Sequence, residues 1–145
     1  MIELIYDDDT FGITINSLKM LRNEIAKRLD HVICVLQIAT GDITCGYLIH
    51  DKTDNVLIWT GDGFRTDGGG EGGAGFKTVI ALFHLWGNRT LEISYQELIA
   101  ECKQLEADYL DINKFINVVW QRYEKEIELF YFTPSENVPI YLRGL

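Results

Sequence analysis

The sequence predicts an α+β fold, a single domain in which helices pack on one face of an antiparallel β-meander. Three consecutive runs rich in β-branched and aromatic residues are separated by short hairpin-type connections. Segments with helical periodicity flank these runs on both sides. The 145 residues contain no internal repeat, low-complexity tract or proline-rich linker, so we expect one α+β domain over residues 1–145.

The N-terminal part predicts a short strand and then a helix. "IELIY" is a candidate strand that could extend the meander, and the following "DDD" and Gly12 break the chain. Apolar residues then recur at three- and four-residue steps, at Ile15, Leu18, Leu21, Ile25 and Leu29. This spacing places one apolar face on a helix over residues 14–29.

The meander itself is predicted from "HVICVLQIAT", "ITCGYLIHD" and "NVLIWTG". The connections "GD" and "KTD" leave room only for tight turns, which join antiparallel strands. A fourth strand would come from "IELIY" or from the C-terminal tail. Within the second run, His50 and Asp51 are adjacent, a pair that could orient an imidazole or simply solvate a turn.

Three helices are expected after the meander. "FKTVIALFHLW" favours a helix over residues 76–86, because Gly87 and Asn88 suit a left-handed helix cap, although a buried strand is the alternative. Ser94 and Glu97 have the spacing of a capping box at the start of the next helix. Asp111 precedes the last helix, whose apolar stripe is Ile112, Phe115, Ile116, Val119, Trp120, Tyr123 and Ile127.

Composition and charge exclude some functions. The formal net charge of −9 disfavours binding to nucleic acid or to an anionic membrane surface. The first residues lack the features of a signal peptide, and no apolar run is long enough to span a membrane, so we expect a cytoplasmic protein. Cys34, Cys45 and Cys102 are expected to be buried reduced thiols. No metal or cofactor is predicted.

The strongest functional signal is residues 60–78, "TGDGFRTDGGGEGGAGFKT", which we call the glycine segment. It holds eight glycines between two apolar runs. A glycine-rich loop that leads into a helix exposes backbone amides at the positive end of the helix dipole, which attracts anions. The predicted ligand-binding residues are Phe64, Arg65, Gly70, Gly72, Gly73, Gly75, Phe76, Lys77 and Thr78. Arg65 and Lys77 would hold phosphate, and Phe64 or Phe76 would stack on a base.

Two known motifs match the glycine segment only in part. Gly70, Gly72 and Gly75 satisfy the dinucleotide fingerprint G-x-G-x-x-G, with Glu92 about twenty residues on, but an antiparallel meander is the wrong context. The segment also approaches a P-loop, but Phe76 stands where that motif has lysine. A one-residue shift rotates a helical side chain by about 100°. Neither motif is therefore assigned, and a flexible surface loop or a subunit contact remains an alternative.

Enzyme signatures are thin, and no nucleophile motif such as G-x-S-x-G accompanies the histidines. The leading hypothesis is a non-catalytic protein that captures a nucleotide or other phosphorylated ligand at the glycine segment, for example as a scavenger of a nucleotide signal. The alternative is an acidic inhibitor that blocks the basic surface of a protein partner, with Glu97, Glu101, Glu106 and Asp108 in one helical region. The apolar and aromatic content of "WQRYEKEIELFYF" also predicts a homo-oligomer.

Overall fold

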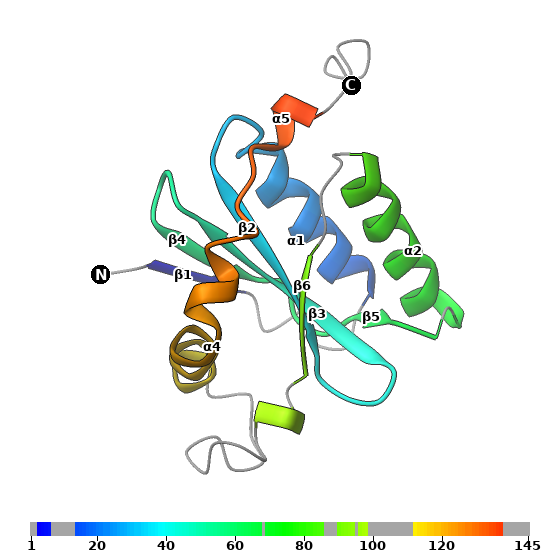
Figure 1. Cartoon of the computed structure of the whole chain (residues 1–145). Coiled ribbons are helices and arrows are strands. Elements are labelled where there is room, and N and C mark those ends of the chain that lie inside the picture. The colour runs from blue at the N-terminus through cyan, green and yellow to red at the C-terminus, as the bar shows by residue number, and fades with distance from the viewer. Residues whose placement is uncertain are drawn as a thin grey trace.

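The computed structural model describes residues 3–6, 14–67, 69–85, 90–94, 96–98 and 112–137. Its strands are β1 (Glu3–Tyr6), β2 (Ile33–Ala39), β3 (Thr44–Asp51), β4 (Val56–Trp59), β5 (Phe64–Arg65) and β6 (Leu91–Ser94). Its helices are α1 (Thr14–Ala26), α2 (Gly70–Leu85), α4 (Ile112–Ile127) and the short α5 (Pro134–Asn137), and residues 96–98 are also helical. Figure 1 shows these elements arranged around one twisted sheet.

The sheet is mixed, which corrects the prediction of an antiparallel meander. The strand order is β1-β4-β3-β2-β6, and β5 pairs with β3. The predicted hairpins β2–β3 and β3–β4 are antiparallel, but β1 pairs parallel to β4, and β6 pairs parallel to β2. Long stretches of chain separate β1 from β4 and β6 from β2, as parallel pairing requires. Turn residues identify only strands that are joined by short hairpins, so they did not predict these two pairings.

Helices cover both faces of this sheet, which corrects the expectation that they pack on one face. On the first face, α1 and α2 contribute Leu21, Ile25 and Val79 to a buried cluster with alternate strand residues. On the second face, α4 supplies Phe115 and Val119 to a separate cluster. Figure 1 shows α1 and α2 on one side of the sheet and α4 on the other.

The cause of this three-layer arrangement is visible in β2, which reads "ICVLQIA" and is buried at consecutive positions. Successive side chains of a strand point to opposite faces, so a nearly continuous apolar run requires cover on both faces. Ile33 and Val35 face α1, whereas Cys34 and Leu36 face α4. The second helical layer therefore follows from the strand sequences.

The helix predictions are largely confirmed. Helix α1 begins at Thr14, as expected, and ends three residues before the predicted boundary. Residues 76–85 are helical rather than a strand. Helix α4 buries most of the predicted stripe, including Phe115, Val119 and Ile127.

The aromatic residues around the end of α4 pack against the chain's own core. Trp120, Tyr123, Phe130 and Tyr131 are partly buried against the cluster on the second face, whereas Leu129 is 82% exposed. An oligomer is thus not needed to cover these aromatic rings, and it remains a prediction. The C-terminal run "VPIYLRGL" lies outside the described residues.

Two of the three cysteines lie in the described part of the chain, and both are free and buried, as predicted. Burial raises the pKa of both Cys34 and Cys45 to about 12. Both thiols therefore stay protonated at neutral pH and are poor nucleophiles. Cys102 falls outside the described residues.

Candidate functional site

The glycine segment is mostly a helix start rather than a loop. Strand β5 is followed by a turn, and α2 begins at Gly70, six residues before the predicted start. Gly70 has a φ of +62°, a backbone conformation that glycine adopts without strain. The first helical hydrogen bond runs from the Gly73 amide to the Gly69 carbonyl, at 2.8 Å.

Close packing accounts for two of the glycines. A Cβ atom on Gly72 would lie 2.7 Å from Cγ of Arg65. A Cβ atom on Gly75 would lie 2.6 Å from Cγ2 of Thr14 and 3.3 Å from the ring of Phe64. The first turns of α2 therefore lie directly against β5 and the start of α1. Gly72 and Gly75 allow this close packing because they have no Cβ atom.

Arg65 is occupied by a neighbouring carboxylate. Its Nε and Nη2 donate to the two carboxylate oxygens of Asp67 at 3.1 and 2.6 Å, and the Gly69 amide also donates to Asp67. The hydrogen bonds from Arg65, together with that amide, lower the pKa of Asp67. A phosphate bound by Arg65 would take the place of this carboxylate.

The other predicted side chains lie in three different environments. Phe64 is fully buried with its ring edge-on to Tyr47, so it offers no face to a ligand. Lys77 and Thr78 lie about two turns into α2, and both are exposed. The Thr78 hydroxyl donates to the Ala74 carbonyl of the same helix at 3.0 Å. Phe76 is half-buried and lines a pocket between α2 and the strands, whereas Gly75 and Thr78 line a smaller one between α1 and α2.

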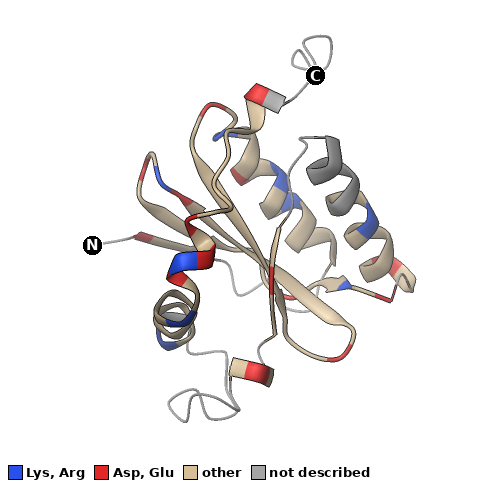
Figure 2. Cartoon of the chain, viewed as in Figure 1, with Lys and Arg blue, Asp and Glu red and all other residues tan. Residues whose placement is uncertain are grey.

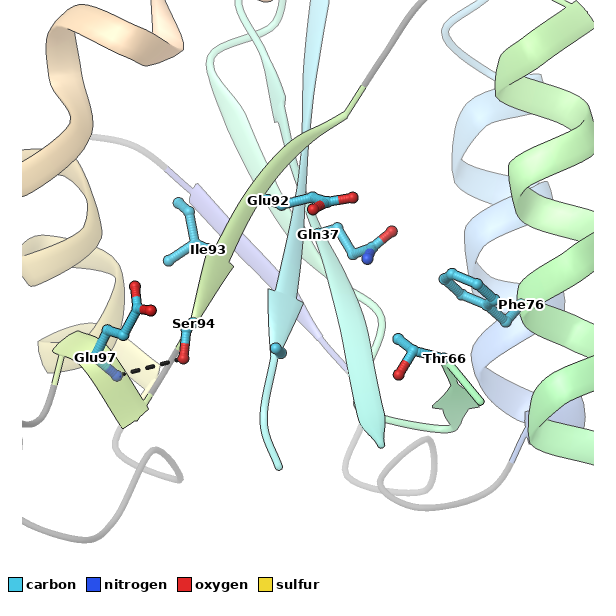
Figure 3. Close-up of a pocket in the computed structure, with 8 residues that line it drawn as sticks. Gln37, Thr66, Phe76, Glu92, Ile93, Ser94 and Glu97 are labelled. Atoms are coloured by element: carbon cyan, nitrogen blue, oxygen red, sulfur yellow. Dashed lines mark hydrogen bonds between the residues drawn. The ribbon is translucent and has the colours of Figure 1, made fainter. Parts of the chain in front are cut away.

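The pocket that Phe76 lines, which we call the β2–β6 pocket, has a volume of about 460 Å³ and lies between the first turns of α2 and the strands β2 and β6. Figure 3 shows the ring of Phe76 extending from α2 toward Gln37 and Glu92 on the facing strands. Its polar and aromatic lining residues are Gln37, Thr66, Phe76, Glu92, Ser94 and Glu97.

Gln37 forms the floor of the β2–β6 pocket and is only 8% exposed. Its Oε1 accepts a hydrogen bond of 3.1 Å from the Tyr47 hydroxyl. Burial raises the pKa of Tyr47 strongly, so this hydroxyl remains a donor throughout the neutral range. Within the described residues, no partner is found for the Gln37 amide nitrogen.

Two acidic residues, Glu92 and Glu97, line the β2–β6 pocket. Glu92 lies on β6 and is exposed, and no hydrogen bond or ion pair ties it to another described residue. Ser94 accepts a hydrogen bond of 3.3 Å from the Glu97 amide, so half of the predicted capping box is formed.

Sequence reasoning found only part of this pocket. Phe76 was predicted as a stacking residue, and Glu92 was singled out only for its distance from the glycines. Gln37, Thr66 and Ser94 were missed, because the register of β2 with β6, which pairs Gln37 with Glu92, joins residues far apart in the chain. The alternation of "LEIS" was the one local signal for β6.

A second polar cluster, the Asp51 network, lies at the end of β3. The Asp51 carboxylate is fully buried and lies 2.9 Å from Arg28 Nε and 2.7 Å from His31 Nδ1. Its other oxygen accepts the amides of Thr53 and Asp54 at 2.9 and 3.0 Å. The network thus joins the end of α1 to the β3–β4 turn.

The charges of the Asp51 network hold the aspartate ionised. Burial alone would raise the pKa of Asp51, but the hydrogen bonds from His31 and the Asp54 amide, with the charges of His31 and Arg28, lower it. Ligand atoms of His31, Asp51 and Asp54 lie within 4.8 Å of one another. A cation there would meet the Arg28 guanidinium and displace the His31 hydrogen bond, so we assign no metal.

His50 does not pair with Asp51, although the two are adjacent in the sequence. His50 and Asp51 point to opposite faces of β3, and the His50 Nδ1 hydrogen-bonds the Tyr131 hydroxyl. Its ring also packs edge-on to Trp120 at 5.3 Å between centroids. Burial lowers the pKa of His50, so its neutral form packs beneath α4. Asp51 instead orients His31.

No protein-family model, curated protein sequence or solved structure matches this chain. Among the described residues, no helix has both the length and the apolar character needed to cross a membrane. The geometry of the β2–β6 pocket and the charges around it are therefore the features that point to a function.

Proposed function

We propose that this protein is a non-catalytic ligand-binding protein that takes a nucleoside or nucleotide in the β2–β6 pocket. The observation that carries the proposal is the position of Phe76, whose ring faces hydrogen-bonding side chains across a cavity of about 460 Å³. A flat heteroaromatic base can stack on such a ring while its edge bonds the opposite wall. The size of the cavity is typical of small-molecule sites.

The phosphate of a nucleotide would lie away from the acidic lining residues of the pocket. Glu92 and Glu97 repel phosphate, whereas Arg65 and Lys77 each adjoin a lining residue in the sequence, Thr66 and Phe76. Arg65 binds carboxylate oxygens already, and a guanidinium binds phosphate with the same two-pronged geometry. In the proposed nucleotide site, the ligand phosphate replaces the Asp67 carboxylate as the hydrogen-bonding partner of Arg65.

The acidic inhibitor ranks second because of where the acids lie. A protein that blocks a basic surface needs a continuous acidic face. Figure 2 shows the described Asp and Glu residues spread over several elements, with Lys and Arg interspersed on α1 and α4. Glu101, Glu106 and Asp108, which motivated this alternative, lie outside the described residues. The net charge of −9 remains its main support.

A thermal-shift panel of nucleosides, mononucleotides and cyclic nucleotides tests the proposal. A ligand at one hundred times its dissociation constant stabilises the fold by about 2.7 kcal/mol. Phe76→Ala removes the aromatic ring on which the base would stack, so we expect about 10- to 100-fold weaker binding. Circular dichroism checks that the variant is still folded. A panel with no stabilising member would overturn the proposal.

Variants that each remove one positive charge test where the phosphate binds. Lys77→Ala and Arg65→Ala should weaken binding of a nucleotide while leaving binding of the matching nucleoside unchanged. Lys27→Ala is the control, because Lys27 is exposed on α1 and pairs with Glu24. Equal losses for nucleotide and nucleoside would place the phosphate elsewhere.

A further inference from the structure

Gln37 and Glu92 form a matched pair in the wall of the β2–β6 pocket. They are partners in the parallel register of β2 and β6, so their side chains leave the sheet on the same face. Figure 3 shows both side chains beside each other and directed toward Phe76. A base stacked on Phe76 would therefore present one edge to both residues.

The pair has a fixed order of hydrogen-bonding groups. The Tyr47 hydroxyl donates to Gln37 Oε1, which leaves the Gln37 amide nitrogen to donate into the pocket. A glutamate carboxylate offers only acceptors. The wall thus presents a donor followed by two acceptors, and a complementary ligand edge reads acceptor, donor, donor.

We infer that the β2–β6 pocket selects a fused ring with a 2-amino-4-oxopyrimidine edge, the edge shared by guanine and the pterins. The ring carbonyl would accept from the Gln37 amide, and the ring N–H and the amino group would donate to the two oxygens of Glu92. This inference rests on the proposed function and names the base that it selects.

Each of the other bases would place at least one acceptor atom against an acceptor of the pocket wall. Adenine places a ring-nitrogen lone pair, and uracil a second carbonyl, against one carboxylate oxygen of Glu92. Cytosine presents two acceptors beside its amino group. A site that loses a hydrogen bond to a charged group loses about 10- to 100-fold in affinity. Guanine is the one nucleic-acid base whose edge meets all three groups.

Titration calorimetry with guanosine, inosine, adenosine and unsubstituted pterin tests the inference on the full chain. Inosine lacks only the 2-amino group, so guanosine should bind about 10- to 100-fold more tightly than inosine, with adenosine weakest. Glu92→Gln replaces one acceptor by a donor and should abolish the difference between guanosine and inosine. Glu124→Gln, on α4 at the opposite face of the sheet, should retain it.

The outcomes separate the two proposals. Adenosine binding as tightly as guanosine, and weakened by Phe76→Ala, would overturn the selection of the edge and leave the nucleoside site in place. Pterin binding without any nucleoside would support the edge and overturn the proposed function. Binding of none of the four probes, nor of any nucleotide, would overturn both.

Discussion

The Asp51 network and the β2–β6 pocket both gather polar side chains at the sheet, yet they differ in how far those groups satisfy one another. Asp51 is fully buried, forms an ion pair with Arg28, and accepts hydrogen bonds from His31 and two backbone amides. Glu92 is exposed and has no partner among the described residues, and the Gln37 amide nitrogen beside it is equally unengaged.

Whether the hydrogen bonds of a polar cluster are complete within the chain indicates which role the cluster has. A buried polar group stabilises a fold only when its hydrogen bonds are complete, and Asp51 meets that condition inside the chain itself. Polar groups that line a cavity without partners instead leave their bonds for another molecule. We therefore assign the Asp51 network to stability, and the unpartnered groups of the pocket support the proposal that it binds a ligand.

We expect the largest effect on stability from Asp51→Ala, which breaks the Asp51 network. The change leaves Arg28 buried with fewer partners and two backbone amides without an acceptor, so we expect a loss of about 3–5 kcal/mol in the free energy of unfolding. Urea unfolding followed by tryptophan fluorescence measures it. Asp54→Ala is the control, because Asp54 is exposed and its carboxylate is 3.8 Å from His31. Equal effects of the two variants would contradict this assignment.

Gly75→Ala tests whether α2 holds the pocket wall by close packing. The added methyl group would lie 2.6 Å from Thr14 Cγ2 and against the buried Phe64 ring, so α2 must shift. Overpacking costs about 1–3 kcal/mol, which outweighs the gain in helix propensity. Gly72→Ala would place its methyl group 2.7 Å from Arg65 Cγ and 3.3 Å from Arg65 Cβ, so it should also destabilise the fold. A Gly75→Ala protein as stable as the parent in urea would refute the packing argument.

The sequence was sufficient for the elements that local patterns define. Hairpins β2–β3 and β3–β4 follow from turn residues, and α1 and α4 from apolar spacing. The start of α2 was not predictable in this way, because glycine has a low helix propensity and the packing against β5 overrides it. The pocket depends on the parallel pairing of β2 with β6, which no short motif encodes.

Acid should weaken the Asp51 network. The pKa of Asp51 is lower in the folded chain than the unfolded value of about 3.9, so its stabilising contribution is complete above that value. The contribution is lost as pH falls below about 4 toward the folded pKa, at up to about 1.4 kcal/mol per pH unit. Asp51→Asn should show a shallower decline of unfolding free energy with acid. An unchanged slope would assign the acid sensitivity to other carboxylates.

Glu92→Gln should have the smallest effect on stability. Glu92 is exposed and has no hydrogen bond or ion pair within the described chain, so the change should alter the free energy of unfolding by no more than about 0.5 kcal/mol. The same variant should lose its preference for guanosine over inosine, because one acceptor facing the base edge becomes a donor. Urea unfolding and calorimetry on one preparation measure both. A stability loss above 1 kcal/mol would show that Glu92 has a structural partner, and the pocket would then resemble the Asp51 network rather than differ from it.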